Sequence, residues 1–259
     1  MAERKVSSGI IGVDNVLKGG YLQQRLTLLK GGPGTGKTIF SLFFAHAEIK
    51  AGSPVVYVSF EESPEQLINH MEQFGLEGKR WVKEGKLKIL DFTMQPDDEV
   101  VGEFDLAAIL LRIEQAGSEI KANTLIIDSL QSLILSFPNY NPNKELVALF
   151  QWAMEENLTT LTTMADVKTI FNSSLYEEYL VDCFIHLAQT VTNKLMTRYL
   201  RVVKYRGSGH GTNEYPYTIN SEGISLIPIT ETRLKSTSSK EYLSSGIKEL
   251  DHMLGGKGL

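Results

Sequence analysis

The sequence has few of the features that would set it apart from ordinary globular proteins. It has a single cysteine, Cys183, which excludes an internal disulfide framework and fits a reducing, cytoplasmic location. No apolar run approaches the roughly 20 residues that a membrane span needs, and residues 1–9 contain no apolar signal core. We therefore expect no membrane partner.

An excess of positive charge is also missing. The chain has 26 Lys and Arg against 31 Asp and Glu, a net charge of −5. Proteins that bind nucleic acid usually carry a basic footprint, so this balance argues against a nucleic-acid partner. What the sequence does have is 259 residues, 42% of them hydrophobic, which is ample for one large core.

A glycine-rich motif near the start of the chain is its most informative segment. The apolar run Leu26–Leu29 predicts a buried strand, Gly31–Thr38 read G-x-x-x-x-G-K-T, and Ile39–Ile49 has helical apolar spacing. Strand, glycine loop and helix are the context of a phosphate-binding loop. Lys37 would reach the β- and γ-phosphates of ATP, and the Thr38 hydroxyl would coordinate Mg²⁺. The predicted nucleotide contacts here are Gly32, Gly34, Thr35, Gly36, Lys37, Thr38 and Ile39.

Two acids, Glu61 and Glu62, lie where the next predicted strand has ended and a helix has not begun. Ser63 is a predicted N-cap, with Pro64 at the first helical position and Gln66 completing a capping box. Ligands bind at the carboxyl ends of strands in a parallel sheet, so these carboxylates could orient and deprotonate an attacking water. The alternative is that they only complement the helix dipole.

A third acid, Asp128, ends the apolar run of "ANTLIIDSL". Beside a phosphate loop, an aspartate at such a strand end is typical of the Mg²⁺ side of a nucleotide site, although any buried strand can end in Asp. The predicted metal ligands are Thr38, Glu62 and Asp128, and Asp128 is also a predicted nucleotide contact.

The second half of the chain is rich in β-branched and apolar residues. Strands are predicted at Thr159–Met164, Cys183–Leu187 and Tyr199–Lys204, and we expect the late ones to be antiparallel. The predicted fold class is therefore α/β, with a mostly parallel central sheet flanked by helices and additional antiparallel strands near the C-terminus.

Three cations, Lys204, Arg206 and His210, cluster at the end of the last of these strands. The simplest interpretation is a solvated basic strand end. The alternative is that these cations reach the nucleotide of a neighbouring subunit and stabilise the charge of the transition state.

The chain also contains a repeat. Without gaps, Ser7–Leu22 and Ser244–Leu259 match at Ser, Ser, Gly, Ile, Asp, Leu, Gly and Leu, eight of sixteen positions. This similarity predicts that a second copy of the opening unit begins near residue 244.

Six motifs together resemble the first ATPase domain of the KaiC family of clock proteins, part of the RecA superfamily. They are "SSGIxxxDxxLxGG", "GTGKT", "FEESPEQL", "VVGEFDL", "IIDSL" and "KYRGSGHGTNEYPYTI", in this order. The resemblance implies a RecA-like P-loop ATPase domain over residues 1–235, a linker at 236–242 and the start of a second homologous domain at 243–259.

The resemblance also implies a function. The domain would be a slow Mg²⁺-dependent ATP hydrolase in a homo-hexameric ring, with ATP at the subunit interfaces and its state controlling the docking of a KaiB-like partner. Phe104 and Asp105 would be central to that docking, and Glu61 and Glu62 would be the paired catalytic glutamates. The residues that would reach the nucleotide from the adjacent subunit are Lys204, Tyr205, Arg206, Ser208 and His210, with Lys204 and Arg206 catalytic.

A complete second domain would add a serine/threonine autokinase and a site for a KaiA-like protein. In this chain, Glu178-Tyr179 stand where that second domain has its phosphate-accepting Ser-Thr pair, so this domain is expected to hydrolyse ATP without phosphorylating itself. The sequence departs from the family at Ala165, where a Glu is usual, and at Ser221, where an acid is usual.

Two other functions share the predicted ATP site. One is a DNA-dependent ATPase of the RecA/RadA type, a recombinase or a helicase motor, which the acidic composition disfavours. The other is a nucleotide-gated scaffold with negligible turnover, which the presence of Glu61, Glu62 and Arg206 disfavours.

Overall fold

The structure is a computed structural model that describes residues 4–93, 106–135, 142–166, 177–226 and 244–253. The chain divides into two units, Met1–Pro228 and Ile229–Leu259, each of which is described by itself. The predicted linker at 236–242 lies outside the described residues. No helix in the described segments is both long and apolar enough to span a membrane.

The described elements alternate between strands and helices over most of the chain. The helices are α1 (Ile11–Val16), α2 (Lys37–Lys50), α3 (Pro64–Gln73), α4 (Gly78–Lys83), α5 (Leu106–Ile120), α6 (Leu130–Leu135), α7 (Pro142–Glu155), α8 (Glu177–Leu180) and α9 (Lys248–Met253). The strands are β1 (Lys5–Val6), β2 (Tyr21–Leu22), β3 (Leu26–Gly31), β4 (Val55–Ser59), β5 (Leu87–Asp91), β6 (Thr124–Asp128), β7 (Thr159–Ala165), β8 (Cys183–Thr192), β9 (Leu195–Tyr205), β10 (Glu214–Asn220) and β11 (Gly223–Leu226).

One large sheet organises the first unit. Among the described strands its order is β11-β10-β9-β8-β3-β7-β6-β4-β5, and β1 pairs separately with β2. The strands from β8 through β3 to β5 run parallel, whereas β9, β10 and β11 continue the sheet in antiparallel pairs. The predicted fold class, a mostly parallel α/β sheet with late antiparallel strands, is confirmed.

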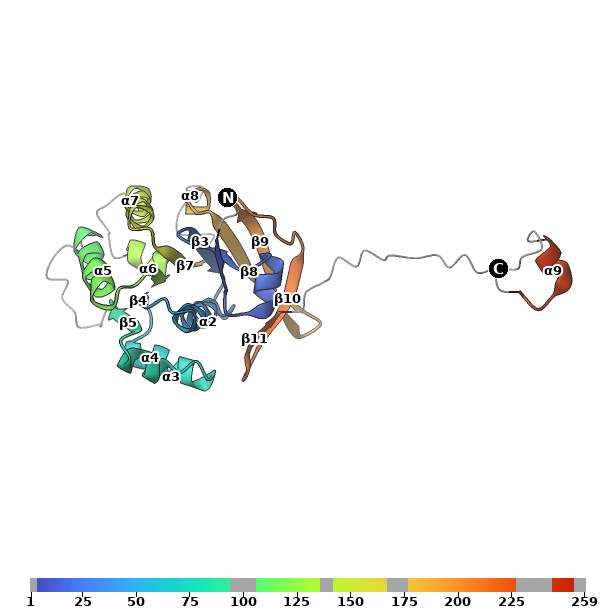
Figure 1. The fold of residues 1–259 in the computed structure, drawn as a ribbon, viewed down its shortest axis with the longest axis horizontal. Coiled ribbons are helices and arrows are strands. Elements are labelled where there is room, and N and C mark those ends of the chain that lie inside the picture. The colour runs from blue at the N-terminus through green and yellow to red at the C-terminus, as the bar shows by residue number, and fades with distance from the viewer. Residues whose placement is uncertain (1–3, 94–105, 136–141, 167–176, 227–243, 254–259) are drawn as a thin grey trace. The chain divides into compact units, whose positions relative to one another are not determined.

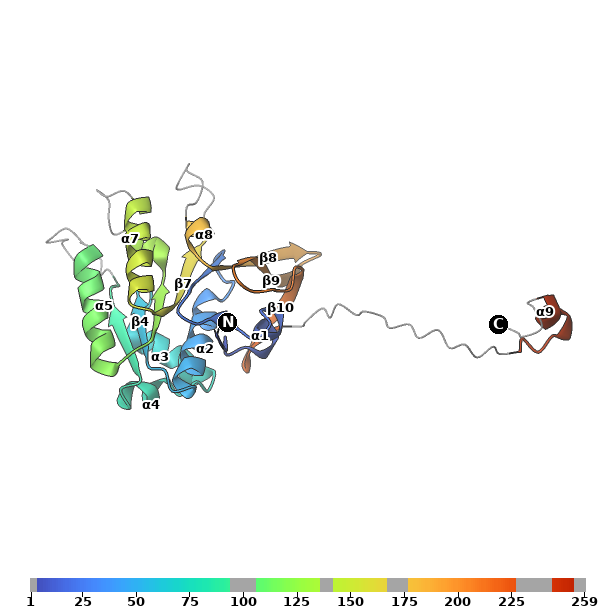
Figure 2. The same ribbon diagram turned by 45° about the horizontal axis from the view of Figure 1, so that its top comes forward.

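Hydrophobic cores lie on both faces of this sheet. Successive side chains of a strand point to opposite faces, so Val55 and Tyr57 of β4 join one core while Val56 and Val58 join the other. Helices α2, α3 and α4 cover the first face, and α5, α6 and α7 cover the second (Figure 1). Figure 2 shows α5 and α7 side by side on that second face. Burial on both faces explains why the strands read as continuous apolar runs.

The start of α3 has the predicted capping box. The Ser63 hydroxyl accepts a hydrogen bond from the backbone N–H of Gln66 at 3.4 Å, and the Gln66 side chain accepts one from the backbone N–H of Ser63 at 2.9 Å. Pro64 is the first helical residue, as expected. This cap fixes the point at which the chain leaves β4, and therefore the position of the two glutamates just before it.

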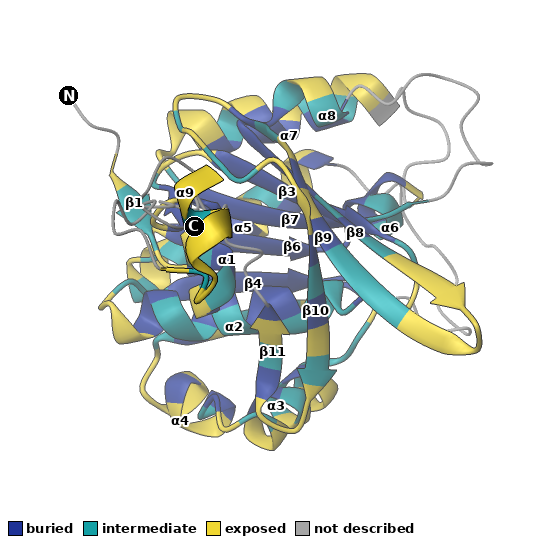
Figure 3. Ribbon diagram, turned by 90° about the vertical axis from the view of Figure 1, so that its right-hand side faces the viewer, coloured by how far each residue is buried: buried dark blue, intermediate teal, exposed yellow. Residues whose placement is uncertain are grey.

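Strands β8 to β11 form what we call the antiparallel segment. The pairing of β8 with β9 continues to Thr192 and Leu195, well past the last residue of β8 that pairs with β3, Leu187. In Figure 3 the central parallel strands are buried, whereas the far end of the β8–β9 hairpin is exposed. The sheet therefore extends beyond β3 on the side where β3 ends, next to the phosphate loop.

The repeated motif forms the same local structure twice. Asp14 accepts hydrogen bonds from the Ser7 hydroxyl at 2.6 Å and the Ser8 amide at 2.7 Å. Asp251 accepts the equivalent hydrogen bonds from the Ser244 hydroxyl at 2.5 Å and the Ser245 amide at 2.8 Å. In the sequence, both Asp251 and the start of α9 come 237 residues after their counterparts, Asp14 and the start of α1. However, α1 buries Val13 and Val16, whereas α9 buries no residue.

Candidate nucleotide site

The phosphate loop connects the end of β3 with the start of α2, as predicted. Gly34 and Gly36 have φ values of +73° and +88°, which residues with a Cβ adopt rarely. A Cβ at Gly36 would also lie only 2.4 Å from the Cδ1 atom of Ile219 on β10. The backbone conformation therefore favours glycine at the second glycine position of the motif, directly before Lys37, and a larger residue there would also displace the end of the Ile219 side chain.

Lys37 lies against the loop that precedes it. Its Nζ donates to the backbone oxygens of Gly31 at 3.0 Å and Gly32 at 3.2 Å. Burial lowers the pKa of Lys37, and the charges of Asp128 and Glu61 oppose that shift. The lysine is thus held between the glycine loop and the acids of the neighbouring strand ends.

Asp128 is buried at the end of β6 and is held by hydroxyl groups from both neighbouring strands. The Tyr57 hydroxyl on β4 donates to Oδ2 at 2.9 Å, and the Thr163 hydroxyl on β7 donates to Oδ1. Burial raises the pKa of Asp128, while hydrogen bonds from Thr163, Thr38 and Tyr57 lower it. The contact with Thr38 brings two of the three predicted metal ligands together.

Glu61 is exposed, but its carboxylate is held in place. The Ser129 hydroxyl donates to Oε1 at 2.6 Å, and the Ser132 hydroxyl donates to the same oxygen at 3.0 Å. Both serines follow β6, so they connect Glu61 to the strand end that bears Asp128. Neither serine was predicted, although both follow the predicted metal aspartate within the stretch "DSLQS".

Glu62 has a different environment from Glu61. It is half-buried, and its Oε2 lies 3.1 Å from Nε2 of His70 on α3. Burial raises the pKa of Glu62; His70 opposes this shift, and the charges of Asp128 and Glu61 add to it. A carboxylate with a raised pKa is a stronger base, which is what proton abstraction from water requires. His70 was not predicted either, because it lies eight residues after Glu62 and this spacing gives no sequence signal for a contact.

Three side chains of the antiparallel segment contact the loop and were also missed. The Gln189 side-chain amide donates to the oxygen of Pro33 at 3.1 Å, Nε of Arg198 donates to that of Gly34 at 3.1 Å, and the Tyr217 hydroxyl donates to that of Thr35 at 2.7 Å. An isolated Gln, Arg or Tyr on a late strand carries no sequence signal for such a contact.

The cations predicted to reach the nucleotide of a neighbouring subunit lie away from the phosphate loop of their own chain. Nζ of Lys204 donates to the backbone oxygens of Glu178 and Tyr179, each at 3.0 Å, and the Arg206 guanidinium donates to that of Tyr179 at 2.9 Å. Two positively charged side chains therefore bind backbone oxygens of α8, and positive charge is favourable near the carboxyl end of a helix. Lys204 is half-buried and Arg206 is exposed.

The strand register separates these cations from the phosphate loop of the same chain. Gly31 of β3 pairs with Leu187 of β8, but Cys183, four residues earlier, pairs with Thr27 on one side and Tyr205 on the other. Four residues of strand span about 13 Å. The residues around Tyr205 therefore lie at the amino end of β3, and the phosphate loop lies at its carboxyl end.

The other residues predicted to reach a neighbouring subunit's nucleotide also lie near the amino end of β3. The Tyr205 ring is buried, and its hydroxyl donates to the oxygen of Gly20 at 2.5 Å, so its side chain has a structural role within this chain. The Ser208 hydroxyl accepts a hydrogen bond from Nζ of Lys5 at 2.7 Å. The His210 ring lies 6.4 Å from that of Tyr205. The predicted partner residues Phe104 and Asp105 lie outside the described residues.

Glu178 takes part in an ion pair. Lys30 of β3 is 3% exposed, and its Nζ lies 3.0 Å from Oε1 of Glu178 and 3.5 Å from Oε1 of Glu177. A buried lysine needs such partners, because an unpaired charge away from water is costly. The carboxylate at position 178 therefore connects α8 to the strand that leads into the phosphate loop.

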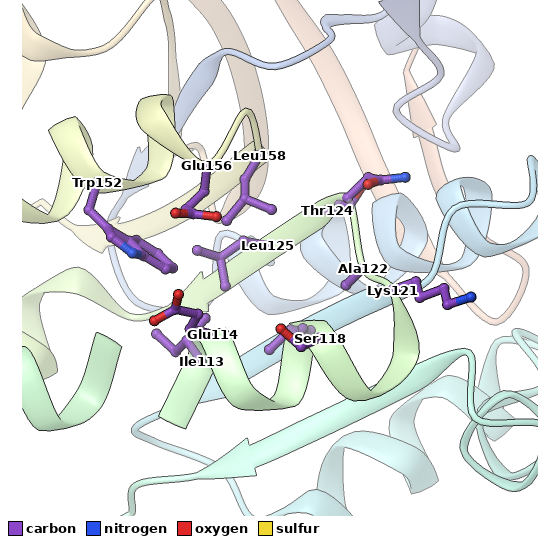
Figure 4. A pocket seen from close by; sticks show the side chains of 13 residues that line it. Ile113, Glu114, Ser118, Lys121, Ala122, Thr124, Leu125, Trp152, Glu156 and Leu158 are labelled. Atoms are coloured by element: carbon purple, nitrogen blue, oxygen red, sulfur yellow. The ribbon is translucent and has the colours of Figure 1, made fainter. Parts of the chain in front are cut away.

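A hollow of about 380 Å³ lies near the amino ends of β4 and β6, whereas the candidate site lies at the carboxyl ends of the strands. Figure 4 shows it between α5 and α7, where Ser118, Trp152 and Glu156 surround the start of β6. It shares no residue with the candidate nucleotide site. Because β6 begins at the hollow and ends at Asp128, the length of that strand separates the two.

The arrangement of the site defines the class of protein. A glycine loop joins a buried strand to a helix, and β7 alone separates that strand from the strand that ends in Asp128. This is the P-loop ATPase class with a RecA-like α/β core. The chain belongs to the KaiC family within it: the family described as "ATPase: KaiC" matches residues 6–231.

Individual relatives agree with this assignment. The chain is 37% identical over 257 residues to the circadian clock protein KaiC2 of Synechocystis sp. PCC 6803, an alignment that covers 98% of this chain and 45% of that protein. It is 36% identical over 260 residues to the circadian clock oscillator protein KaiC of Synechococcus elongatus, covering 97% and 50%. The chain thus spans about half the length of the curated relatives it matches.

Proposed function

We propose that this chain is the ATP-hydrolysing domain of a KaiC-like ring protein, a component of a circadian clock or of clock-related signalling. The observation that carries the proposal is the meeting of Lys37, Thr38, Asp128 and the two glutamates at one edge of the sheet. Membership of the KaiC ATPase family and similarity to named clock proteins support it.

The residues present fit ATP and Mg²⁺. Thr38 and Asp128 offer oxygen ligands, which Mg²⁺ prefers, and Glu62 supplies a second nearby carboxylate. The metal would neutralise charge on the β- and γ-phosphates, while Lys37 and the loop amides bind the phosphate oxygens. The other nucleotide contacts proposed in the loop are Gly32, Gly34, Thr35, Gly36 and Ile39.

Hydrolysis requires one proton transfer from water. The water oxygen forms a bond to the γ-phosphorus, the bond from that phosphorus to the β–γ bridging oxygen breaks, and ADP and phosphate leave. Glu62, whose pKa is raised by burial, accepts the proton of the water, and Glu61 orients that water.

We further propose that Lys204 and Arg206 act on the nucleotide of the adjacent subunit, as catalytic groups of a homo-hexameric ring. Their position at the far end of β3 from the phosphate loop supports this, because an interface is then needed to bring the two ends together. Ser208 and His210 would approach the same nucleotide.

Lys37→Ala is expected to weaken ATP binding by about 10- to 100-fold, since it removes a charge-assisted contact with the phosphates. With ATP at the interfaces, the same change should weaken assembly. Size-exclusion chromatography and equilibrium binding of ATP, with Lys50→Ala at the far end of α2 as control, measure both effects. A variant that binds ATP like wild type would refute the proposed site.

His70→Ala is expected to move the acid limb of the pH–rate profile to higher pH. Glu62 must be ionised to accept a proton, so turnover falls as the pH is lowered through its pKa. His70 holds that pKa down, so its removal raises the pKa and the loss of activity begins at a higher pH. Turnover measured across pH, with the exposed neighbour change Asn69→Ala as control, tests this; an unshifted limb contradicts the role of Glu62 as the base.

A KaiB-like protein is the proposed partner, with its docking set by the nucleotide state. Phe104→Ala or Asp105→Ala is expected to weaken that docking about tenfold or more and to change ATP turnover less than twofold, since hot-spot side chains carry most interface energy. Pull-down with the KaiB homologue of the same host measures the effect, and undiminished binding by both variants would rule out this segment. A second domain of a longer chain would carry the autokinase and KaiA-like sites.

A further inference from the structure

One row of side chains across the antiparallel segment contacts three successive residues of the phosphate loop. In the strand register Gln189 of β8 lies opposite Arg198 of β9, and Arg198 lies opposite Tyr217 of β10. Side chains paired in this way lie on the same face of the sheet. Three adjacent strands therefore present a line of three hydrogen-bond donors to the loop.

The acceptors of these three hydrogen bonds are also consecutive in the sequence. They are the backbone oxygens of Pro33, Gly34 and Thr35, three consecutive peptide groups. In a planar trans peptide the C=O of one residue and the N–H of the next point in opposite directions. With their oxygens turned toward the antiparallel segment, these peptides direct the amides of Gly34, Thr35 and Gly36 away from it. Such amides are the groups with which a phosphate loop binds its ligand.

The contacts differ in burial, and the best protected is that of Tyr217. Its side chain is 2% exposed, and its ring packs edge-on against Phe40 of α2. Burial raises the pKa of Tyr217, so the hydroxyl stays protonated and remains a donor at neutral pH. The contacts of Arg198 and Gln189 with the loop are exposed.

We infer that Gln189, Arg198 and Tyr217 are positioning residues that hold the phosphate-loop amides in their binding orientation before the nucleotide arrives. The inference rests on the proposed ATP site. It adds that the antiparallel segment acts on that site, although its strands carry none of the loop's own motif. A loop held in this way binds the phosphates without first being ordered, which lowers the cost of binding.

Two variants test the inference, with a matched control. Tyr217→Phe removes one hydroxyl and keeps the packed ring, and Arg198→Ala removes the central donor. Arg201→Ala is the control, because it removes an exposed arginine of the same strand that contacts Glu214 and not the loop. The measurements are KM and kcat for ATP in the full chain, and amide hydrogen exchange of residues 34–37 without nucleotide.

Each of the two variants is expected to raise KM about 5- to 10-fold and to change kcat less than twofold, because the amides bind phosphate equally in the ground and transition states. Exchange at the loop should become about 5- to 10-fold faster, whereas Arg201→Ala leaves all three quantities at wild-type values. Wild-type exchange in both variants would overturn the inference, whatever happens to KM. If the wild-type chain hydrolyses no ATP, the proposed function fails, and the exchange measurement still decides the positioning role.

Discussion

Arg206→Ala is expected to bind ATP with wild-type affinity and to hydrolyse it about 10³- to 10⁵-fold more slowly, the range of effects seen when an arginine is supplied to a phosphoryl group in trans. The reason is geometric. Arg206 follows Tyr205, which lies level with Thr27, at the opposite end of β3 from the phosphate loop. In the proposed ring, the variant therefore keeps every loop contact with its own nucleotide and loses the charge that Arg206 would offer to the neighbouring subunit's nucleotide.

Steady-state phosphate release and equilibrium binding of a fluorescent ATP analogue measure the two parts of this prediction. Arg201→Ala is again the control. Because Arg206 also donates to the oxygen of Tyr179, thermal unfolding should be compared to show that α8 remains in place. Turnover within tenfold of wild type would remove Arg206 from the mechanism.

The double change Glu61→Gln with Glu62→Gln is expected to slow hydrolysis about 10²- to 10⁴-fold while ATP binding is preserved. An amide keeps the shape of the carboxylate and can still accept hydrogen bonds from Ser129 and Ser132, but it cannot accept a proton from water. Glu65→Gln, an exposed change in the first turn of α3, is the control.

The single variants should differ. Glu62 has a pKa raised by burial, whereas Glu61 has its carboxylate bound by two hydroxyls, so Glu62→Gln is expected to account for most of the loss. Phosphate release from each single variant at saturating ATP measures how much of the loss of turnover each glutamate accounts for. Wild-type turnover in the double variant would exclude both residues as the base.

Local patterns predicted the parts of this site that depend on neighbouring residues in the chain. The glycine loop, the capping box at Ser63, the position of Glu61 between a strand and a helix, and the strand end at Asp128 are such features, and the structure has each of them where it was expected. Each depends on a backbone conformation or a cap that a few successive residues determine. The antiparallel pairing of the late strands was predicted for the same reason.

Contacts between distant strands could not be predicted. Tyr57 reaches Asp128 only because β4 and β6 are neighbours in the sheet, and that order is a property of the whole topology. Lys30 directly follows the predicted apolar run Leu26–Leu29 and was given no role, yet it is buried against Glu177 and Glu178, almost 150 residues away. No spacing in the sequence encodes such pairs.

The row from Gln189 through Arg198 to Tyr217 also escaped prediction. Counting from the hairpin turn gives the pairing of Gln189 with Arg198, because the irregularity of the β8–β9 pairing lies farther along, between Phe184 and Ile185. The pairing of Arg198 with Tyr217 and the approach of the row to the phosphate loop depend on the order of the strands in the sheet, which no local pattern encodes.

Mixed rings of Lys37→Ala and Arg206→Ala subunits test the central claim, that a site in one subunit is completed by the next. The first variant has a defective phosphate loop and an intact arginine, and the second has the reverse. Native mass spectrometry of the two variants with different mass tags would establish co-assembly, and phosphate release would then be measured. Interfaces in which an intact loop meets an intact arginine exist only in mixed rings, so activity is expected to return well above that of either variant alone. Mixed rings that form and remain as inactive as the separate variants would contradict the account.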